Sequence, residues 1–177
     1  MFSAWGSAVC SSDPPPGPHV DPPAHMRPGG AALDSYGAEK FAGTAVVADC
    51  RGQAAITLPL LKSYNLTGVD FVLFCTGWDK KWGSSAYYEG FPCLTADAAG
   101  YLASLPLKGV GEDTISLDPC DSTDFPNHIA LMRSDFVTTA NLTGLDDLIG
   151  RRFTFVTLPL KFENSDGCSC RAIAMEE

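Results

Sequence analysis

The chain has 177 residues, 45% of them apolar, with a formal net charge of −9 and a pI near 4.6. This composition is typical of a folded globular domain. The 12 Lys and Arg residues are scattered along the chain, which argues against a nucleic-acid partner. The apolar runs are too short to span a membrane, so we expect a small-molecule ligand and no membrane partner.

The cysteines and the first residues bear on the cellular compartment. Seven cysteines is an odd number, and their spread along the chain favours reduced thiols over a disulfide framework. The opening stretch MFSAWGSAVC lacks the basic start and apolar core of a signal peptide. We therefore expect a cytoplasmic protein.

The beginning of the chain differs from the rest in its proline content. Prolines concentrate before residue 30, and the run from Pro14 to Pro16 can neither continue a helix nor donate hydrogen bonds to a sheet. We predict an irregular Pro-rich segment over residues 1–16 and a single domain over residues 17–177.

Strand and helix patterns alternate after residue 40. Short helices or turns are predicted over 56–65 and 125–135. The segment 69–77 is almost continuously apolar, which indicates a strand covered on both faces. Apolar or β-branched runs predict strands over 43–50, 69–77, 136–142 and 151–162, a strand leading into a loop over 108–118, and a closing edge strand over 170–175.

The clearest helix pattern covers residues 94–106. Thr95 is placed to cap its N-terminus, and Pro106 stops it. Its apolar face is formed by residues at i, i+3, i+4 and i+7, namely Ala98, Tyr101, Leu102 and Leu105. The alternation of helices and strands, with strands predominating, predicts an α/β domain.

Two of the three histidines lie in the segment HVDPPAH, residues 19–25. In extended backbone His19 and Asp21 project from one face, and an imidazole beside a carboxylate suits zinc or manganese. Pro22 and Pro23 stiffen the chain before His25, whose imidazole suits acid–base catalysis beside a water activated by the metal. By spacing alone the signal is weak, because scattered surface histidines that have no such role are common.

This segment and four later ones resemble the cyclase family of metal-dependent hydrolases, which includes bacterial-type kynurenine formamidases and isatin hydrolases. The signature H-x-G-T-H-x-D-x-P-x-H is matched at Gly17, His19, Asp21, Pro23 and His25. The later segments include FVLFCTGWDKKWGSSAYYEGFPCLTADAAGYL, and VGEDTISLDP, which is similar to V-G-I-D-T-x-S-L-D. Similarity continues to roughly residue 174.

The resemblance implies a fold, a metal and a reaction. The fold is a swivelling β/β/α-like domain with a mixed, partly barrel-like sheet and flanking helices. A divalent metal, zinc or manganese, would be held by His19, Asp21 and His128, with His25 as the catalytic acid–base. The implied reaction is hydrolysis of an aryl formamide, as in the conversion of N-formylkynurenine to kynurenine and formate in tryptophan catabolism.

The resemblance also bears on other residues and on assembly. Trp78 is a candidate for stacking on the aryl ring of the substrate, although a place in the core accounts for it equally well. Asp118 would brace the loop that carries His128, or simply form a turn. A homodimer or larger homo-oligomer is expected, and exposed strand edges would favour association.

Two ligand positions depart from the family pattern. The first signature histidine falls on Pro15, and a late acidic ligand falls on Ala140. Asp13 is a candidate replacement for the ligand at Pro15. The sequence therefore leaves open an active metal-dependent amidase, a degenerate member that keeps the fold without metal or turnover, and a small-molecule binding protein.

Overall fold

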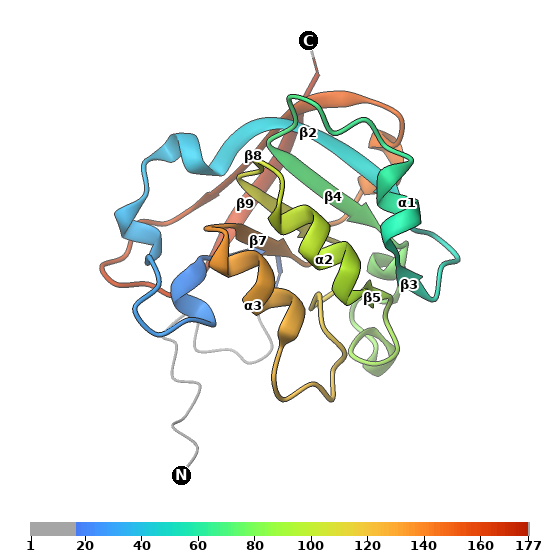
Figure 1. The fold of residues 1–177 in the computed structure, drawn as a ribbon, viewed down its shortest axis with the longest axis horizontal. Helices are drawn as coiled ribbons and strands as arrows, with labels where there is room; N and C mark the ends of the chain where they lie inside the picture. The colour runs from blue at the N-terminus through green and yellow to red at the C-terminus, as the bar shows by residue number, and fades with distance from the viewer. Residues whose placement is uncertain (1–16, 177) are drawn as a thin grey trace.

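A closed barrel of seven strands forms the centre of the computed structural model, which describes residues 17–176 (Figure 1). The barrel order is β1-β7-β6-β4-β2-β8-β9, and β9 pairs back with β1. The barrel strands are β1 (His19–Asp21), β2 (Ala42–Asp49), β4 (Phe71–Cys75), β6 (Gly109–Glu112), β7 (Val137–Ala140), β8 (Arg152–Pro159) and β9 (Cys168–Met175). The predicted Pro-rich segment 1–16, with Asp13 and Pro15, lies outside the described residues.

The remaining elements surround the barrel. Two short strands, β3 (Ala55–Ile56) and β5 (Cys93–Leu94), form a separate parallel pair. The α-helices are α1 (Leu58–Lys62), α2 (Ala96–Ala103) and α3 (Pro126–Arg133), and Figure 1 shows all three on one side of the barrel. The single-turn 3₁₀ helices are η1 (Pro23–His25), η2 (Leu33–Ser35), η3 (Ala38–Phe41), η4 (Trp78–Lys81), η5 (Ser85–Tyr87) and η6 (Leu145–Leu148).

The sheet is mixed, which confirms the predicted fold class. Strands β2, β4, β6 and β7 run parallel to their neighbours within that group. Strands β1, β8 and β9 pair in antiparallel fashion, so that β1 joins β7 on one side and β9 on the other. The parallel strands therefore end together at one rim of the barrel, where ligand sites of parallel sheets commonly lie.

Strand β4 shows how the barrel divides the core into two apolar clusters. Leu73 packs inside the barrel with Val20 and other inward residues. Phe74, one residue along, packs outside with Leu102 of α2 and Leu131 of α3. All five residues of β4 are buried, which confirms a strand covered on both faces.

Two of three local predictions are confirmed and one is wrong. The strand within 108–118 is β6, which ends at Glu112 and leads into a loop, and the Asp113 carboxylate accepts hydrogen bonds from the loop after β4. Residues 170–175 pair with β8 on one side, as predicted for a closing edge strand, and the preceding residues Cys168 and Ser169 pair with β1. The Thr95 hydroxyl donates to the Ile56 carbonyl instead of capping α2.

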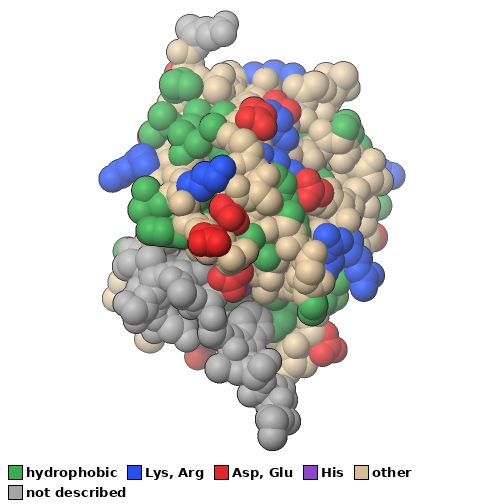
Figure 2. All heavy atoms as spheres, turned by 90° about the vertical axis from the view of Figure 1, so that its left-hand side faces the viewer, with side chains coloured by type: hydrophobic (Ala, Val, Ile, Leu, Met, Phe, Trp, Pro, Cys, Tyr) green, Lys and Arg blue, Asp and Glu red, His purple; other side chains and the backbone are tan. Residues whose placement is uncertain are grey.

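Charged side chains on the surface show no segregation by sign on the face drawn in Figure 2, where Lys and Arg lie among Asp and Glu. Within residues 17–176, no helix combines the length and apolar character required to cross a membrane. All six cysteines in this range are free.

Gly109 provides a test of the close strand contact between β6 and β7. A Cβ atom at Gly109 would collide with the Val137 backbone carbonyl oxygen, which cannot move without breaking the sheet. We expect Gly109→Ala to lower the free energy of unfolding by about 1–3 kcal/mol, because overpacked cores must shift backbone.

Gly100 is the matched control, because a Cβ there meets nothing within 4 Å on the exposed side of α2. Gly100→Ala should raise the free energy of unfolding by about 0.5–1 kcal/mol, since alanine favours helix. Urea unfolding of both variants measures the difference. Equal effects from the two substitutions would contradict the proposed collision.

Candidate functional site

His19 and Asp21 lie together on the outer face of the barrel. Val20 between them is buried in the inner cluster, so alternation along β1 directs His19 and Asp21 outward. The two residues are 6% and 7% exposed, and His19 Nε2 lies 3.3 Å from Asp21 Oδ2. The register of β1 against β7 places His19 opposite Ala140. The i, i+2 spacing thus brings the imidazole and carboxylate together, as predicted.

His25 approaches the same carboxylate from η1. Pro23 begins this turn, and His25 Nδ1 lies 4.0 Å from Asp21 Oδ1. The His25 side chain is 19% exposed, compared with 8% for that of His19. Its imidazole therefore stands between the buried carboxylate and solvent, where a proton-transferring group has access to both.

His128 is held at the start of α3 by Asp118. The Asp118 carboxylate accepts hydrogen bonds from the backbone N–H groups of Asn127 and His128, at 3.0 Å each. It also lies 2.7 Å from His128 Nδ1. Burial would raise the Asp118 pKa, but the imidazole and the two N–H groups hold that pKa below its usual value. The bracing contact expected from the S-L-D pattern is therefore present, and it fixes the ring orientation of His128.

The charges of the three histidines converge on Asp21. Burial alone would raise the Asp21 pKa, but His19, His25 and His128 together lower it. Conversely, burial would lower the His19 pKa, and Asp21 raises it above the usual value. His128 acts on Asp21 through space, and within residues 17–176 no hydrogen bond or ion pair joins it to the His19–Asp21 pair. The structure thus brings His19, Asp21 and His25 into near contact and sets His128 slightly apart.

Asn141 connects Tyr87 to His19, and the sequence did not identify Asn141 as a site residue. The Tyr87 hydroxyl donates to Asn141 Oδ1 at 2.7 Å, and Asn141 Nδ2 lies 3.1 Å from the Gly17 carbonyl and 3.4 Å from His19 Nδ1. Asn141 has a φ of 59°, in the left-handed region that asparagine tolerates better than most residues. An asparagine directly after a strand was the only sequence signal for this role.

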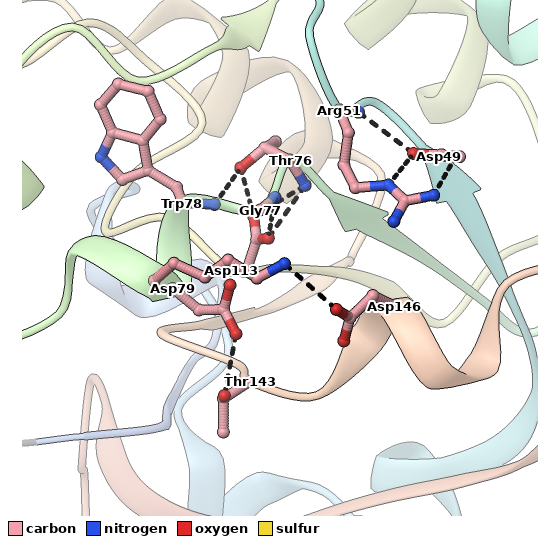
Figure 3. Close-up of polar contacts among 10 residues, drawn as sticks. Asp49, Arg51, Thr76, Gly77, Trp78, Asp79, Asp113, Thr143 and Asp146 are labelled. Carbon is pink, nitrogen blue, oxygen red and sulfur yellow. Dashed lines mark hydrogen bonds and ion pairs between the residues drawn. The ribbon is translucent and has the colours of Figure 1, made fainter.

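Trp78 lies in a loop that polar contacts hold rigidly (Figure 3). Asp113 accepts hydrogen bonds from the N–H groups of Thr76 and Gly77, at 2.9 Å and 2.7 Å. The Trp78 indole N–H donates to the Tyr87 carbonyl, and Lys81 Nζ lies 3.1 Å from the ring centroid. A series of contacts through Tyr87 and Asn141 therefore links Trp78 to His19.

The imidazole and carboxylate groups around Asp21 are of the kinds that bind a divalent cation, but they do not form a compact cluster. Among residues 17–176, no three His, Cys, Asp or Glu side chains lie close enough together to hold a metal ion. Glu112, however, is a buried carboxylate that has no hydrogen-bond partner for either oxygen in the same range. Imidazole nitrogens with carboxylates that lack partners are a donor set suited to zinc or manganese.

A comparison with protein families agrees with this geometry. The family model described as "Putative cyclase" matches residues 8–119. The chain belongs to the cyclase family. The match includes the HVDPPAH segment and ends just after Asp118, so the cyclase family accounts for both β1 and the S-L-D segment.

Individual cyclase-family relatives and their structures cover most of the chain. A protein named kynurenine formamidase from Salinibacter ruber is 31% identical over 162 residues, covering 89% of this chain and 74% of that protein. A structure described as a potential metal-dependent hydrolase with cyclase activity has a TM-score of 0.79 at 27% identity, covering 90% and 77% of the two chains. Isatin hydrolase A from Ralstonia solanacearum has a TM-score of 0.78 at 26% identity, covering 90% and 72%.

Asp118 provides a test of how α3 is positioned. The Asp118 carboxylate accepts hydrogen bonds from the backbone N–H groups of Asn127 and His128 and faces the His128 imidazole. Asp118→Asn removes the negative charge and replaces one acceptor oxygen by an NH₂ group. We expect the free energy of unfolding to fall by about 1–3 kcal/mol, the usual loss for buried hydrogen bonds to a charged group. Chemical unfolding monitored by circular dichroism measures this loss.

Asp121→Asn is the control, since Asp121 is exposed on the same loop. It should change the free energy of unfolding by no more than about 0.5 kcal/mol. A similar cost for both substitutions would show that Asp118 has no special bracing role.

Proposed function

We propose that this cyclase-family chain is a metal-dependent amidase that hydrolyses an aryl formamide, converting N-formylkynurenine to kynurenine and formate. The observation that carries the proposal is that two imidazoles face one buried carboxylate: His19 Nε2 lies 3.3 Å from Asp21 Oδ2, and His25 Nδ1 lies 4.0 Å from Asp21 Oδ1. Similarity to kynurenine formamidases and isatin hydrolases supports an aryl amide substrate. A cytoplasmic location and a homo-oligomer remain predictions from the sequence.

His19, Asp21 and His128 are the residues that would hold the metal, zinc or manganese. Nδ1 of His128 lies 2.7 Å from Asp118, so Nε2 of that ring is the nitrogen available to a metal. Nε2 of His19 lies 3.3 Å from Asp21 Oδ2, so an ion held by both residues would displace the proton between them. When bound, the ion would activate water and polarise the substrate carbonyl.

His25 would move the proton during hydrolysis. Its imidazole accepts the proton of the attacking water and passes it to the aniline nitrogen as the C–N bond breaks. The nearby Asp21 carboxylate stabilises the imidazolium formed between these steps. Trp78 remains a predicted stacking residue, although its indole N–H and one ring face are already engaged by Tyr87 and Lys81.

A second candidate function is a cyclase-family protein that keeps the fold without metal or turnover. The replacement of a ligand by Ala140 favours it, as does the spread of donors around Asp21. The two functions differ in metal binding, so metal content per chain separates them.

Substitution of His25 tests the proton-transfer role. We expect His25→Ala to lower kcat for N-formylkynurenine by at least about 100-fold, the usual contribution of a positioned acid–base group. The melting temperature should stay close to that of the wild type, because the side chain is partly exposed. Unchanged kcat in a folded His25→Ala protein would remove His25 from the mechanism.

Removal of metal tests the dependence on a divalent ion. Treatment with EDTA, followed by gel filtration, should abolish hydrolysis of N-formylkynurenine, and added zinc or manganese should restore it. Magnesium is the control ion, since it prefers oxygen ligands and binds poorly to imidazole. Full activity after chelation, with no metal left by mass spectrometry, would contradict the proposal.

A further inference from the structure

Glu112 is a buried carboxylate without a partner. The residue is 1% exposed, and neither of its side-chain oxygens has a hydrogen-bond partner among residues 17–176. The neighbouring buried carboxylates differ in this respect, since Asp113 accepts from Thr76 and Gly77, and Asp118 accepts from the start of α3. Burial of a carboxylate without a partner is costly, so its retention calls for a compensating interaction.

Other carboxyl groups lie around Glu112. Burial raises the Glu112 pKa well above its usual value, and Asp113, Asp21 and Asp118 raise it further. Asp21 and Asp118 are also the carboxylates that contact His19 and His128. Glu112 therefore lies in the same region as the candidate site.

Strand register places Glu112 beside Ala140. Gly111 of β6 pairs with Thr139 of β7, so the next residues, Glu112 and Ala140, are level in the parallel ladder. Ala140 in turn pairs with His19 of β1. Glu112, Ala140 and His19 thus form one row across three adjacent strands.

The three side chains of this row share the outer face of the barrel. Val110, two residues before Glu112, packs in the outer cluster beneath the helices, which fixes the direction of Glu112 by alternation. Two strand spacings separate the backbones of Glu112 and His19 by about 10 Å. The Ala140 methyl group between them is short, so the longer side chains can meet above it.

The sequence departs from the cyclase pattern at both neighbouring positions. The V-G-I-D-T pattern has an apolar residue where this chain has Glu112, and the late acidic position of the pattern falls on Ala140. This chain therefore has a carboxylate on β6 and a methyl group on β7, where the pattern has the reverse. The two changes keep one carboxylate in the same row of side chains.

We propose that Glu112 is a ligand of the divalent metal in this chain, supplying from β6 the carboxylate that Ala140 does not supply from β7. This inference rests on the proposed function, because it assumes an ion at His19, Asp21 and His128. Glu112 adds a fourth donor, giving two imidazoles and two carboxylates, a set suited to zinc or manganese. The Glu112 side chain has rotatable bonds enough to turn its carboxylate toward these residues.

Zinc affinity and thermal stability test the proposal together. Glu112→Ile removes the buried carboxylate and suits the apolar neighbours of the outer cluster, so the melting temperature in EDTA should rise. Its zinc Kd, measured with a competing chelator, should increase at least about tenfold, and the rise in melting temperature on adding zinc should shrink. Glu112→Gln, which is nearly isosteric, should weaken zinc binding in the same way and serves if Glu112→Ile does not fold.

Two further variants complete the experiment. Adding Ala140→Glu to Glu112→Ile returns the carboxylate to β7 and should restore zinc affinity. Glu163→Gln is the control, because Glu163 is exposed and the substitution makes the same change of side chain as Glu112→Gln. Its zinc Kd and melting temperature should match those of the wild type.

The outcomes separate this inference from the proposed function. Wild-type zinc affinity in Glu112→Ile and Glu112→Gln, with binding lost in His19→Ala, would overturn the role of Glu112 and leave the metal-dependent amidase standing. Absence of zinc and manganese binding by the wild-type chain would overturn both.

Discussion

Strand β1 both closes the barrel and carries the site. All three residues pair with β7 on one side, and His19 and Val20 also pair with β9 on the other. The same pairing directs Val20 into the inner core and His19 and Asp21 outward. The apolar burial of Val20 therefore holds the imidazole and the carboxylate in place, and a shift of one residue in β1 would exchange the two faces.

The site is a concentration of buried charge at the rim where the parallel strands end. Asp21, Glu112, Asp113 and Asp118 are each no more than 7% exposed. Asp113 serves structure, because it fixes the loop after β4, and Asp118 fixes the start of α3. Asp21 is compensated by histidines, and only Glu112 of these four has no partner in the described part of the chain. Such a departure from the usual pairing of buried charge is typical of functional regions.

The proposed metal centre gives one explanation for features that are otherwise unrelated. Nδ1 of His128 faces Asp118, which leaves Nε2 of that ring for a ligand, and Nε2 of His19 faces Asp21. The carboxylate stands on β6, at Glu112, in place of the position on β7 that Ala140 occupies, and the two positions are neighbours in the sheet. In this view the loss at Ala140 is compensated within the sheet, and the chain need not be a degenerate cyclase.

The sequence alone determined the α/β class, a helix within 94–106, a buried strand within 69–77 and the meeting of His19 with Asp21, because each follows from periodicity or spacing within a short segment. It also identified the cyclase family through motifs in the correct order. Only the tertiary structure showed that β9 closes the barrel, that Asn141 connects Tyr87 to His19, and that Glu112 stands beside Ala140. These relations join residues far apart in the chain, and they depend on strand order and register, which local patterns do not encode.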